Sequence, residues 1–296
     1  NVLPGSHLTP GDLEEIREIV EAFGLDPVFI PDLSGSLDGH IPEDFTPTTL
    51  GGTTIEQLRS MGAARMTLAI GEQMHAAAIE LEMRTGVPYV LFDRLTGLEA
   101  NDRLMQQLSS LSGKPVPEKY RRQRSRLQDA MLDAHFFTGG KKVALGAEPD
   151  LLWSLGNLLA EMGCDIAAAV TTTQSPLLEK LPTEEVLIGD LEDLEHRAKD
   201  CDLLITHAHG RQMAQRLNIP FLRFGIPTFD RLGAAHKMTV GYRGTMDLVF
   251  ELGNMFLAQE HEPTPDSWAQ AEKTSTACGS GCGCASQPAT VEIAFG

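Results

Sequence analysis

Short apolar runs that alternate with helix-length segments are the feature that most constrains how this chain folds. In the second half, Asp202–Thr206 (DLLIT) and Pro220–Phe224 (PFLRF) read as buried strands, and His209–Leu217 between them is long enough for a helix. Apolar strands that alternate with helices are typical of parallel sheets covered on both faces. We therefore expect an α/β fold with two Rossmann-like, doubly wound parallel sheets.

The same alternation divides the chain into two domains and a tail. The first domain is predicted to span residues 1–137 and to close with a long bridging helix, Pro117–Phe136. A Thr-Gly-Gly sequence breaks that helix, so the second domain is predicted to span residues 138–260. Residues 261–296 are rich in Gly, Ser and Pro, and we expect them to form a flexible tail.

Local signals place several elements inside these domains. Thr9, followed three residues later by Asp12, predicts a capped helix, and Thr53 with Glu56 predicts a second one. Pro27–Ile30 is predicted to be a short strand. The last helix is predicted to begin at about Met246 and to end near Ala258.

Composition narrows the possible partners and the compartment. The formal net charge is −17, with 41 acidic and 24 basic residues, which argues against a nucleic-acid binder. There is no apolar run of the roughly 20 residues that a membrane span needs, and no signal peptide is recognised. Five cysteines in an α/β pattern favour a reducing cytoplasm. Because the chain opens on Asn1 in what looks like a strand end, we expect part of the natural protein to precede it.

The turn that opens the second domain argues against dinucleotide binding. Gly146–Asp150 (GAEPD) lacks the glycines that let a pyrophosphate approach the helix amides. Glu148 and Asp150 would repel phosphate, and they are better explained as acidic residues favoured at the amino end of a helix.

Two groups of residues are candidate metal ligands. Cys278, Cys282 and Cys284 form a C-x₃-C-x-C pattern that suits an iron–sulfur cluster or a soft metal ion, although a complete site needs four ligands. The alternative is an inert tail. His207 and His209 follow a predicted strand, but no third ligand is evident, so a solvent-facing turn is the favoured interpretation.

A Gly- and Pro-rich loop follows the predicted strand Pro220–Phe224. Loops at the carboxyl ends of strands in open α/β sheets are where ligands and partners bind. Its polar side chains are therefore candidates for an interface with a partner subunit or between the domains. They are Asp230, Arg231, His236, Tyr242 and Arg243.

Several stretches in a fixed order carry a family resemblance. They are Asn1–His40, Gly51–Thr54 (GGTT), Ser112–Pro117 (SGKPVP), Tyr120–His135, Ala147–Leu152 (AEPDLL) and Phe224–Thr245. Through them the chain resembles the β-like subunits of the nitrogenase component 1 superfamily, from Asn1 to about Gln259. Within that superfamily, Pro4–His40 looks like the cofactor-scaffold branch rather than the catalytic branch.

The resemblance implies a function and a set of partners. Subunits of this superfamily have three Rossmann-like domains, of which this chain would be the second and third. The scaffold branch matures the nitrogenase iron–molybdenum cofactor before its transfer to apo-nitrogenase. The implied partners are the α-like scaffold subunit NifE in a heterotetramer, the nitrogenase iron protein and other cofactor-assembly proteins.

The resemblance also implies where the cofactors lie. An iron–sulfur cluster would lie at the interface with the partner subunit, and its β-side cysteine would come from the first domain. The chain has no matching cysteine before Cys164. The cofactor precursor would be held mainly by the partner, so no residue here is carried over as a cofactor ligand and little turnover is expected from the chain alone.

Two other functions stay open at this point. The first is catalysis, as the β subunit of nitrogenase or of a related pigment reductase. The second is binding of a small molecule in the cleft between the domains, which predicts a ligand-dependent rise in melting temperature.

Overall fold

Two parallel sheets organise the computed structural model, which describes residues 1–39, 44 and 52–259. The three-stranded sheet has the order β1-β2-β3, and the five-stranded sheet has the order β6-β5-β4-β7-β8. The strands are β1 (Val2–Pro4), β2 (Thr67–Ile70), β3 (Tyr89–Phe92), β4 (Lys142–Gly146), β5 (Asp165–Thr171), β6 (Val186–Ile188), β7 (Leu203–Thr206) and β8 (Phe221–Arg223). All pairs are parallel, which confirms the predicted α/β class.

The predicted strand Pro27–Ile30 is wrong as a strand, because the structure reduces it to a single bridge. Phe29 pairs with Val2, and Val2 exchanges backbone hydrogen bonds with Val28 and Ile30 at 2.8 and 2.9 Å. Pro27 and Pro31 flank this segment, and proline lacks the N–H that a longer ladder would need. This bridge lies on the side of β1 that faces away from β2. The chain therefore pairs first on one side of β1 and then, through β2, on the other side, as in a doubly wound sheet.

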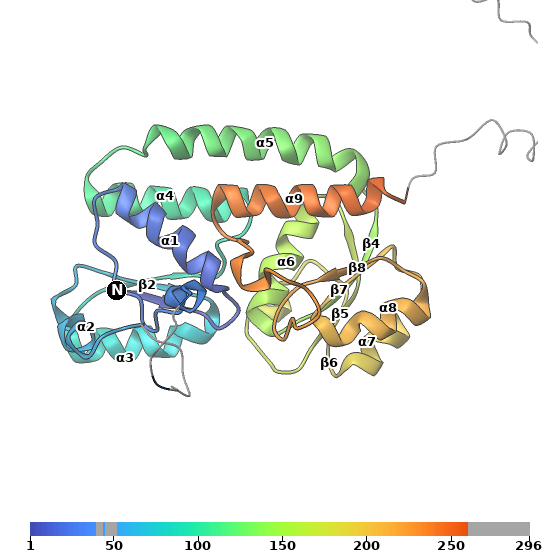
Figure 1. The fold of residues 1–296 in the computed structure, drawn as a ribbon, viewed down its shortest axis with the longest axis horizontal. Helices are drawn as coiled ribbons and strands as arrows, with labels where there is room; N and C mark the ends of the chain where they lie inside the picture. The colour runs from blue at the N-terminus through green and yellow to red at the C-terminus, as the bar shows by residue number, and fades with distance from the viewer. Residues whose placement is uncertain (40–43, 45–51, 260–296) are drawn as a thin grey trace, which may run out of the picture. The chain divides into compact units, whose positions relative to one another are not determined.

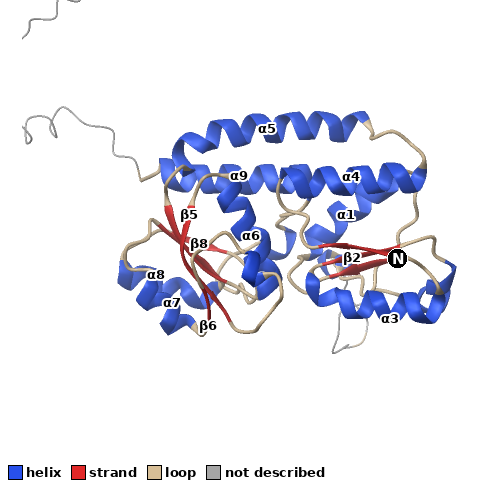
Figure 2. Cartoon of the chain, turned by 180° about the vertical axis from the view of Figure 1, so that it is seen from behind, coloured by secondary structure: helices blue, strands red, loops and turns tan. Residues whose placement is uncertain are grey.

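Helices cover both faces of each sheet (Figures 1 and 2). On the three-stranded sheet, α1 (Pro10–Ala22) and α4 (Leu98–Ser112) lie on the face opposite α2 (Ile55–Ser60) and α3 (His75–Thr85). On the five-stranded sheet, α6 (Pro149–Glu161) lies opposite α7 (Leu191–Arg197) and α8 (Arg211–Leu217). This layering is what buries both faces of parallel strands.

Two long helices run side by side along the α4 and α6 side of the unit (Figure 1). The bridging helix predicted at Pro117–Phe136 is α5, Glu118–Thr138, and it packs along α9, Gly241–Leu257. Helix α9 begins five residues before the predicted start at Met246. Gly241 has a φ of +73°, a conformation that glycine adopts without strain, and it opens the helix.

The two capping predictions have different outcomes. At α1, Thr9 and Asp12 exchange the predicted capping-box hydrogen bonds, both 3.0 Å long. At α2, the box is formed by Thr54 and Gln57 rather than by Thr53 and Glu56. Thr53 is used elsewhere, because its hydroxyl donates to the Phe29 carbonyl at 2.7 Å and accepts from the Asp32 N–H at 3.0 Å.

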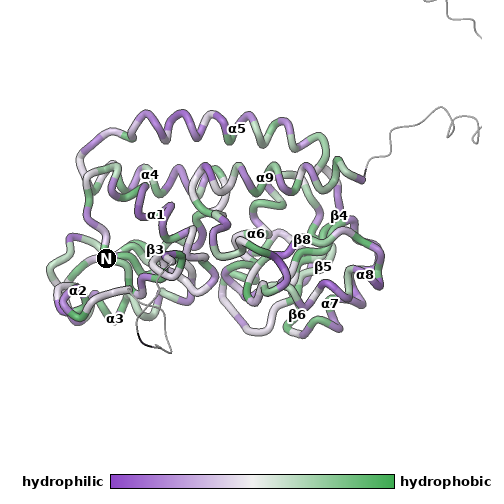
Figure 3. The backbone as a smooth tube through the Cα atoms, viewed as in Figure 1, coloured by the Kyte–Doolittle hydropathy of each residue, from purple (hydrophilic) through white to green (hydrophobic). Residues whose placement is uncertain are grey.

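The core follows the alternation of side chains along the strands. In β4, Val143 and Leu145 join a large apolar cluster that continues through α1, α4, α5, α6 and α9, whereas Ala144 faces a smaller cluster under α7 and α8. Figure 3 shows the five-stranded sheet as hydrophobic and the start of α5 as hydrophilic. The large cluster contains side chains from both sheets, so residues 1–257 pack as one unit.

Two predictions about organisation have no structural outcome here. The predicted boundary at residues 137 and 138 falls at the end of α5, between the two sheets, and the division into separate domains stays a prediction. The predicted tail, 261–296, lies outside the described residues. Within the described ranges, no helix is long and apolar enough to cross a membrane.

Candidate functional site

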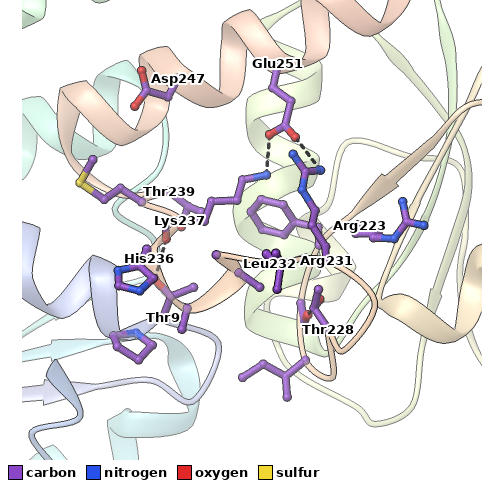
Figure 4. A pocket seen from close by; sticks show the side chains of 18 of the residues that line it. Thr9, Arg223, Thr228, Arg231, Leu232, His236, Lys237, Thr239, Asp247 and Glu251 are labelled. Atoms are coloured by element: carbon purple, nitrogen blue, oxygen red, sulfur yellow. Dashed lines mark hydrogen bonds and ion pairs between the residues drawn. The ribbon is translucent and has the colours of Figure 1, made fainter. Parts of the chain in front are cut away.

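A cavity of about 600 Å³ lies beside the carboxyl end of β8 (Figure 4). Its walls come from the residues that follow β8, from the turn between β1 and α1, and from the side of α9. Both sheets thus contribute the carboxyl end of a strand, which is where open α/β sheets bind ligands. A volume between about 300 and 1,000 Å³ is typical of small-molecule sites.

Three charged side chains meet at one wall of this cavity. Lys237 Nζ lies 2.5 Å from Glu251 Oε2, and an Arg231 guanidinium nitrogen lies 3.3 Å from Glu251 Oε1. Lys237 Nζ also lies 4.8 Å from the centre of the Phe224 ring. Burial lowers the pKa of Lys237, and Glu251 opposes that shift. The Glu251 carboxylate therefore pairs with both Lys237 and Arg231.

Asp12 ties the segment that ends the loop to the start of α1. Its Oδ1 accepts hydrogen bonds from the backbone N–H of Thr239 at 2.5 Å and of Val240 at 3.2 Å, while Oδ2 caps Thr9. Burial raises the pKa of Asp12, and the hydrogen bonds from Thr9 and Thr239 oppose that shift. Thr9 Oγ1 in turn donates to the Lys237 carbonyl at 2.7 Å. These bonds hold the cavity wall in place.

The structure separates the loop candidates into two groups. Asp230 is internal: its side chain is 8% exposed and each carboxylate oxygen lies 2.9 Å from Arg223 Nε. Arg231 and His236 are exposed and line the cavity. Their role at an interface stays a prediction.

Tyr242 and Arg243 belong to the first turn of α9 and not to the loop where they were predicted. The Tyr242 hydroxyl donates to Asp102 Oδ1 at 2.6 Å. Arg243 pairs with Glu15 and lies 3.3 Å from Glu18. Both side chains therefore join α9 to helices that cover the three-stranded sheet.

Tyr242→Phe should lower the free energy of unfolding by about 1.5–3 kcal/mol, because the buried hydroxyl donates to a charged group. Urea denaturation of the isolated chain measures the change. Tyr89→Phe, which removes a 3.1 Å contact with the neighbouring His75 ring, is the control and should cost less. If Tyr242→Phe leaves the free energy of unfolding unchanged, the hydrogen bond to Asp102 does not stabilise the fold, and only contacts outside this chain would remain as a role for Tyr242.

Three large apolar side chains of the loop after β8 are mostly exposed to solvent, and two of them, Ile226 and Leu232, also line the cavity at its open side. Ile226 is 72% exposed, Phe229 is 66% exposed and Leu232 is 99% exposed. Single exposed apolar residues are common, but a group of them in one loop marks a possible interaction surface. We call Ile226, Phe229 and Leu232 the loop surface.

In the acidic turn Gly146–Asp150, one carboxylate makes a contact with the other sheet that the sequence did not indicate. Glu148 caps its own helix as predicted, accepting from the Leu151 N–H at 2.7 Å. Asp150 instead accepts from the backbone N–H groups of Glu72 and Gln73 at 3.0 and 3.2 Å, next to the amino end of α3. His7 lies beside this contact, and burial lowers its pKa to about 4 while Asp150 opposes the shift.

The two histidines after β7 lie in contact with each other. The rings of His207 and His209 are 5.4 Å apart, edge to face, and His209 also contacts Phe229 at 5.1 Å. Within residues 1–39, 44 and 52–259, no three or more His, Cys, Asp or Glu side chains form a group that could hold a metal ion. The predicted metal ligands Cys278, Cys282 and Cys284 lie outside the described residues.

Sequence reasoning missed Lys237, Glu251 and the contacts of Asp12 and Asp150. Asp12 was recognised only as a local cap and Asp150 only as an acid at a helix end. Lys237 is separated from Glu251 by 14 residues and Asp12 from Thr239 by 227. The only available signal was the loop itself, which follows a strand at a carboxyl edge.

Comparison with known proteins gives a consistent result. The family model described as nitrogenase component 1 type oxidoreductase matches residues 1–257. The nitrogenase iron-molybdenum cofactor biosynthesis protein NifN of Bradyrhizobium diazoefficiens is 59% identical over 273 residues, which cover 90% of this chain and 58% of that protein. NifN of Nostoc sp. is 54% identical over 259 residues, covering 88% of this chain and 58% of that protein.

A solved structure agrees with these relatives. The structure titled nitrogenase Cp1 at pH 6.5 superposes with a TM-score of 0.82 at 34% identity, covering 90% of this chain and 61% of that chain. The chain thus spans less than two thirds of the length of each of these three proteins.

Proposed function

The chain belongs to the nitrogenase component 1 type oxidoreductase family, and from this premise we propose that it acts in the scaffold on which the nitrogenase iron–molybdenum cofactor is matured. The observation that carries the proposal is the identity of 59% and 54% to two proteins named for biosynthesis of this cofactor. Identity at this level extends over about nine tenths of the chain, so it covers both sheets and the cavity between them.

The proposal assigns this chain a structural part in a larger complex. It would contribute to the β-like subunit, pair with NifE in a heterotetramer in the cytoplasm, and receive the nitrogenase iron protein and other assembly proteins. An iron–sulfur cluster at the interface with NifE would take its β-side ligand from outside this chain, and NifE would hold most of the cofactor precursor.

We infer that the loop surface takes part in these contacts. Its three side chains, Ile226, Phe229 and Leu232, are large and exposed. Hydrogen bonds of Asp12 and Asp230 hold the loop in place. An anchored loop that presents apolar side chains to solvent is suited to protein docking.

Activity and activation assays test the scaffold role. The polypeptide that carries this sequence is co-purified anaerobically with NifE, and the complex is assayed with iron protein and ATP for acetylene reduction and for activation of cofactor-free nitrogenase. We expect strong activation with little acetylene reduction. High turnover by the complex itself would instead identify a catalytic β subunit.

A pair of surface variants tests the docking role. Leu232→Ser removes the most exposed apolar side chain of the loop surface and should weaken recovery of the complex about tenfold or more. Met83→Ser removes a side chain that is 70% exposed on α3 and serves as the control. Equal recovery of both variants would remove the loop surface from the partner interface.

A further inference from the structure

The lining of the cavity beside β8 includes three basic side chains, Arg223, Arg231 and Lys237, and two acidic ones, Asp247 and Glu251. Lys237 and Arg231 both rely on Glu251, at 2.5 and 3.3 Å. Their side chains are 26% and 53% exposed, so they can be reached from the cavity. An ammonium and a guanidinium that share one carboxylate can accept a second anion without losing the first.

The neighbouring acids are held by other groups, and Asp12 in addition favours the charged form of Lys237. Asp12 is held by backbone N–H groups of Thr239 and Val240 and by Thr9, and Asp230 is held by Arg223. Asp247 also lines the cavity, and burial raises its pKa. Figure 4 shows Asp247 apart from the ion pair, one turn earlier on α9.

Much of the remaining wall is apolar. Phe224, Ile226, Leu232 and Met238 line the cavity together with small residues of the loop. The Phe224 ring lies under Lys237 Nζ, which keeps water from one side of the ammonium. Apolar walls with a few convergent polar groups are the usual composition of a small-molecule site.

We propose that this cavity binds a small organic carboxylate, with its acid group on Lys237 and Arg231 and its carbon skeleton against the apolar wall. Arg231 offers a planar guanidinium, which matches a carboxylate in geometry, and Lys237 offers a compact charge. The cavity volume of about 600 Å³ fits a molecule of this class. The proposal does not depend on the scaffold role, because it concerns the isolated chain.

Calorimetric titration tests the proposal with defined probes. The 296-residue chain is titrated with sodium benzoate and sodium succinate at constant ionic strength, and benzamide is the neutral counterpart of benzoate. We expect saturable binding and a rise in melting temperature with at least one carboxylate and with no amide. Saturable binding of benzamide as tight as that of benzoate, or no binding of either carboxylate, would overturn the proposal.

Three variants locate the binding. Lys237→Met and Arg231→Gln should each weaken carboxylate binding about ten-fold to a hundred-fold, because each removes a charge-assisted hydrogen bond. Arg231 is half exposed, so its variant tests the site even if Lys237→Met fails to fold. Lys199→Met changes an exposed lysine elsewhere and should bind as the unmodified chain does. Equal affinity in all three variants would place the binding outside this cavity.

Discussion

Replacing Asp12 with alanine should lower the free energy of unfolding by about 3–5 kcal/mol, the largest loss that we expect from any single change at the site. The substitution leaves the buried N–H groups of Thr239 and Val240 without their acceptor and removes the cap on Thr9. Part of this loss is offset, because a carboxylate whose pKa is raised by burial is itself costly to desolvate. Urea denaturation measures the change.

Two further variants make this measurement specific. Asp12→Asn keeps one acceptor oxygen and should cost less than alanine does. Glu14→Ala changes an exposed acid on the same helix and should stay within about 0.5 kcal/mol of the parent chain. A loss in Asp12→Ala no larger than that in Glu14→Ala would mean that the bonds to Thr239 and Val240 contribute nothing to stability.

Acidification should destabilise the chain through His7 by about 2 kcal/mol between pH 7 and pH 5, and by about 3 kcal/mol at pH 4. The ordinary pKa of histidine is about 6.5, and burial lowers that of His7 to about 4. Between these values the unfolded chain binds a proton that the folded chain does not bind. Stability from this group is therefore complete above pH 6.5 and is lost as the pH falls toward 4.

The His7→Gln variant isolates this contribution. Other buried acids, such as Glu15 and Glu161, have raised pKa values and act in the opposite direction, so the total pH profile is a sum. The difference in unfolding free energy between the parent chain and His7→Gln should shrink by the stated amount as the pH is lowered. A difference that stays constant from pH 7 to pH 5 would contradict a His7 that is neutral in the folded chain.

Much of the fold could be predicted because its signals are local. The strands predicted at Asp202–Thr206 and Pro220–Phe224 correspond to β7 (Leu203–Thr206) and β8 (Phe221–Arg223), with bounds that differ by at most one residue. The capping box at Thr9 involves residues three positions apart, so sequence spacing alone reveals it. The box at Thr54 was placed one residue early, since both Thr53 and Thr54 offer a hydroxyl and only tertiary contacts with Phe29 and Asp32 decide between them.

The site was less predictable because its contacts join distant parts of the chain. The loop after β8 was identified by its position at a carboxyl edge, but the partners of Tyr242 and Arg243 come from α4 and α1. No spacing rule relates Asp150 to the amides of Glu72 and Gln73, because the contact depends on how the two sheets pack. Sequence patterns thus located the region, and packing determined the role of each side chain.

The bonds between α1 and the segment that opens α9 have a consequence for the order of folding during synthesis. Asp12 precedes Thr239 by 227 residues. At about 5–20 residues per second, the ribosome needs roughly 10–50 seconds to make that intervening length. Until then, the buried Asp12 carboxylate on α1 lacks its donor Thr239, and Glu15 lacks its partner Arg243. The first sheet therefore completes its packing only after the last described helix has been translated.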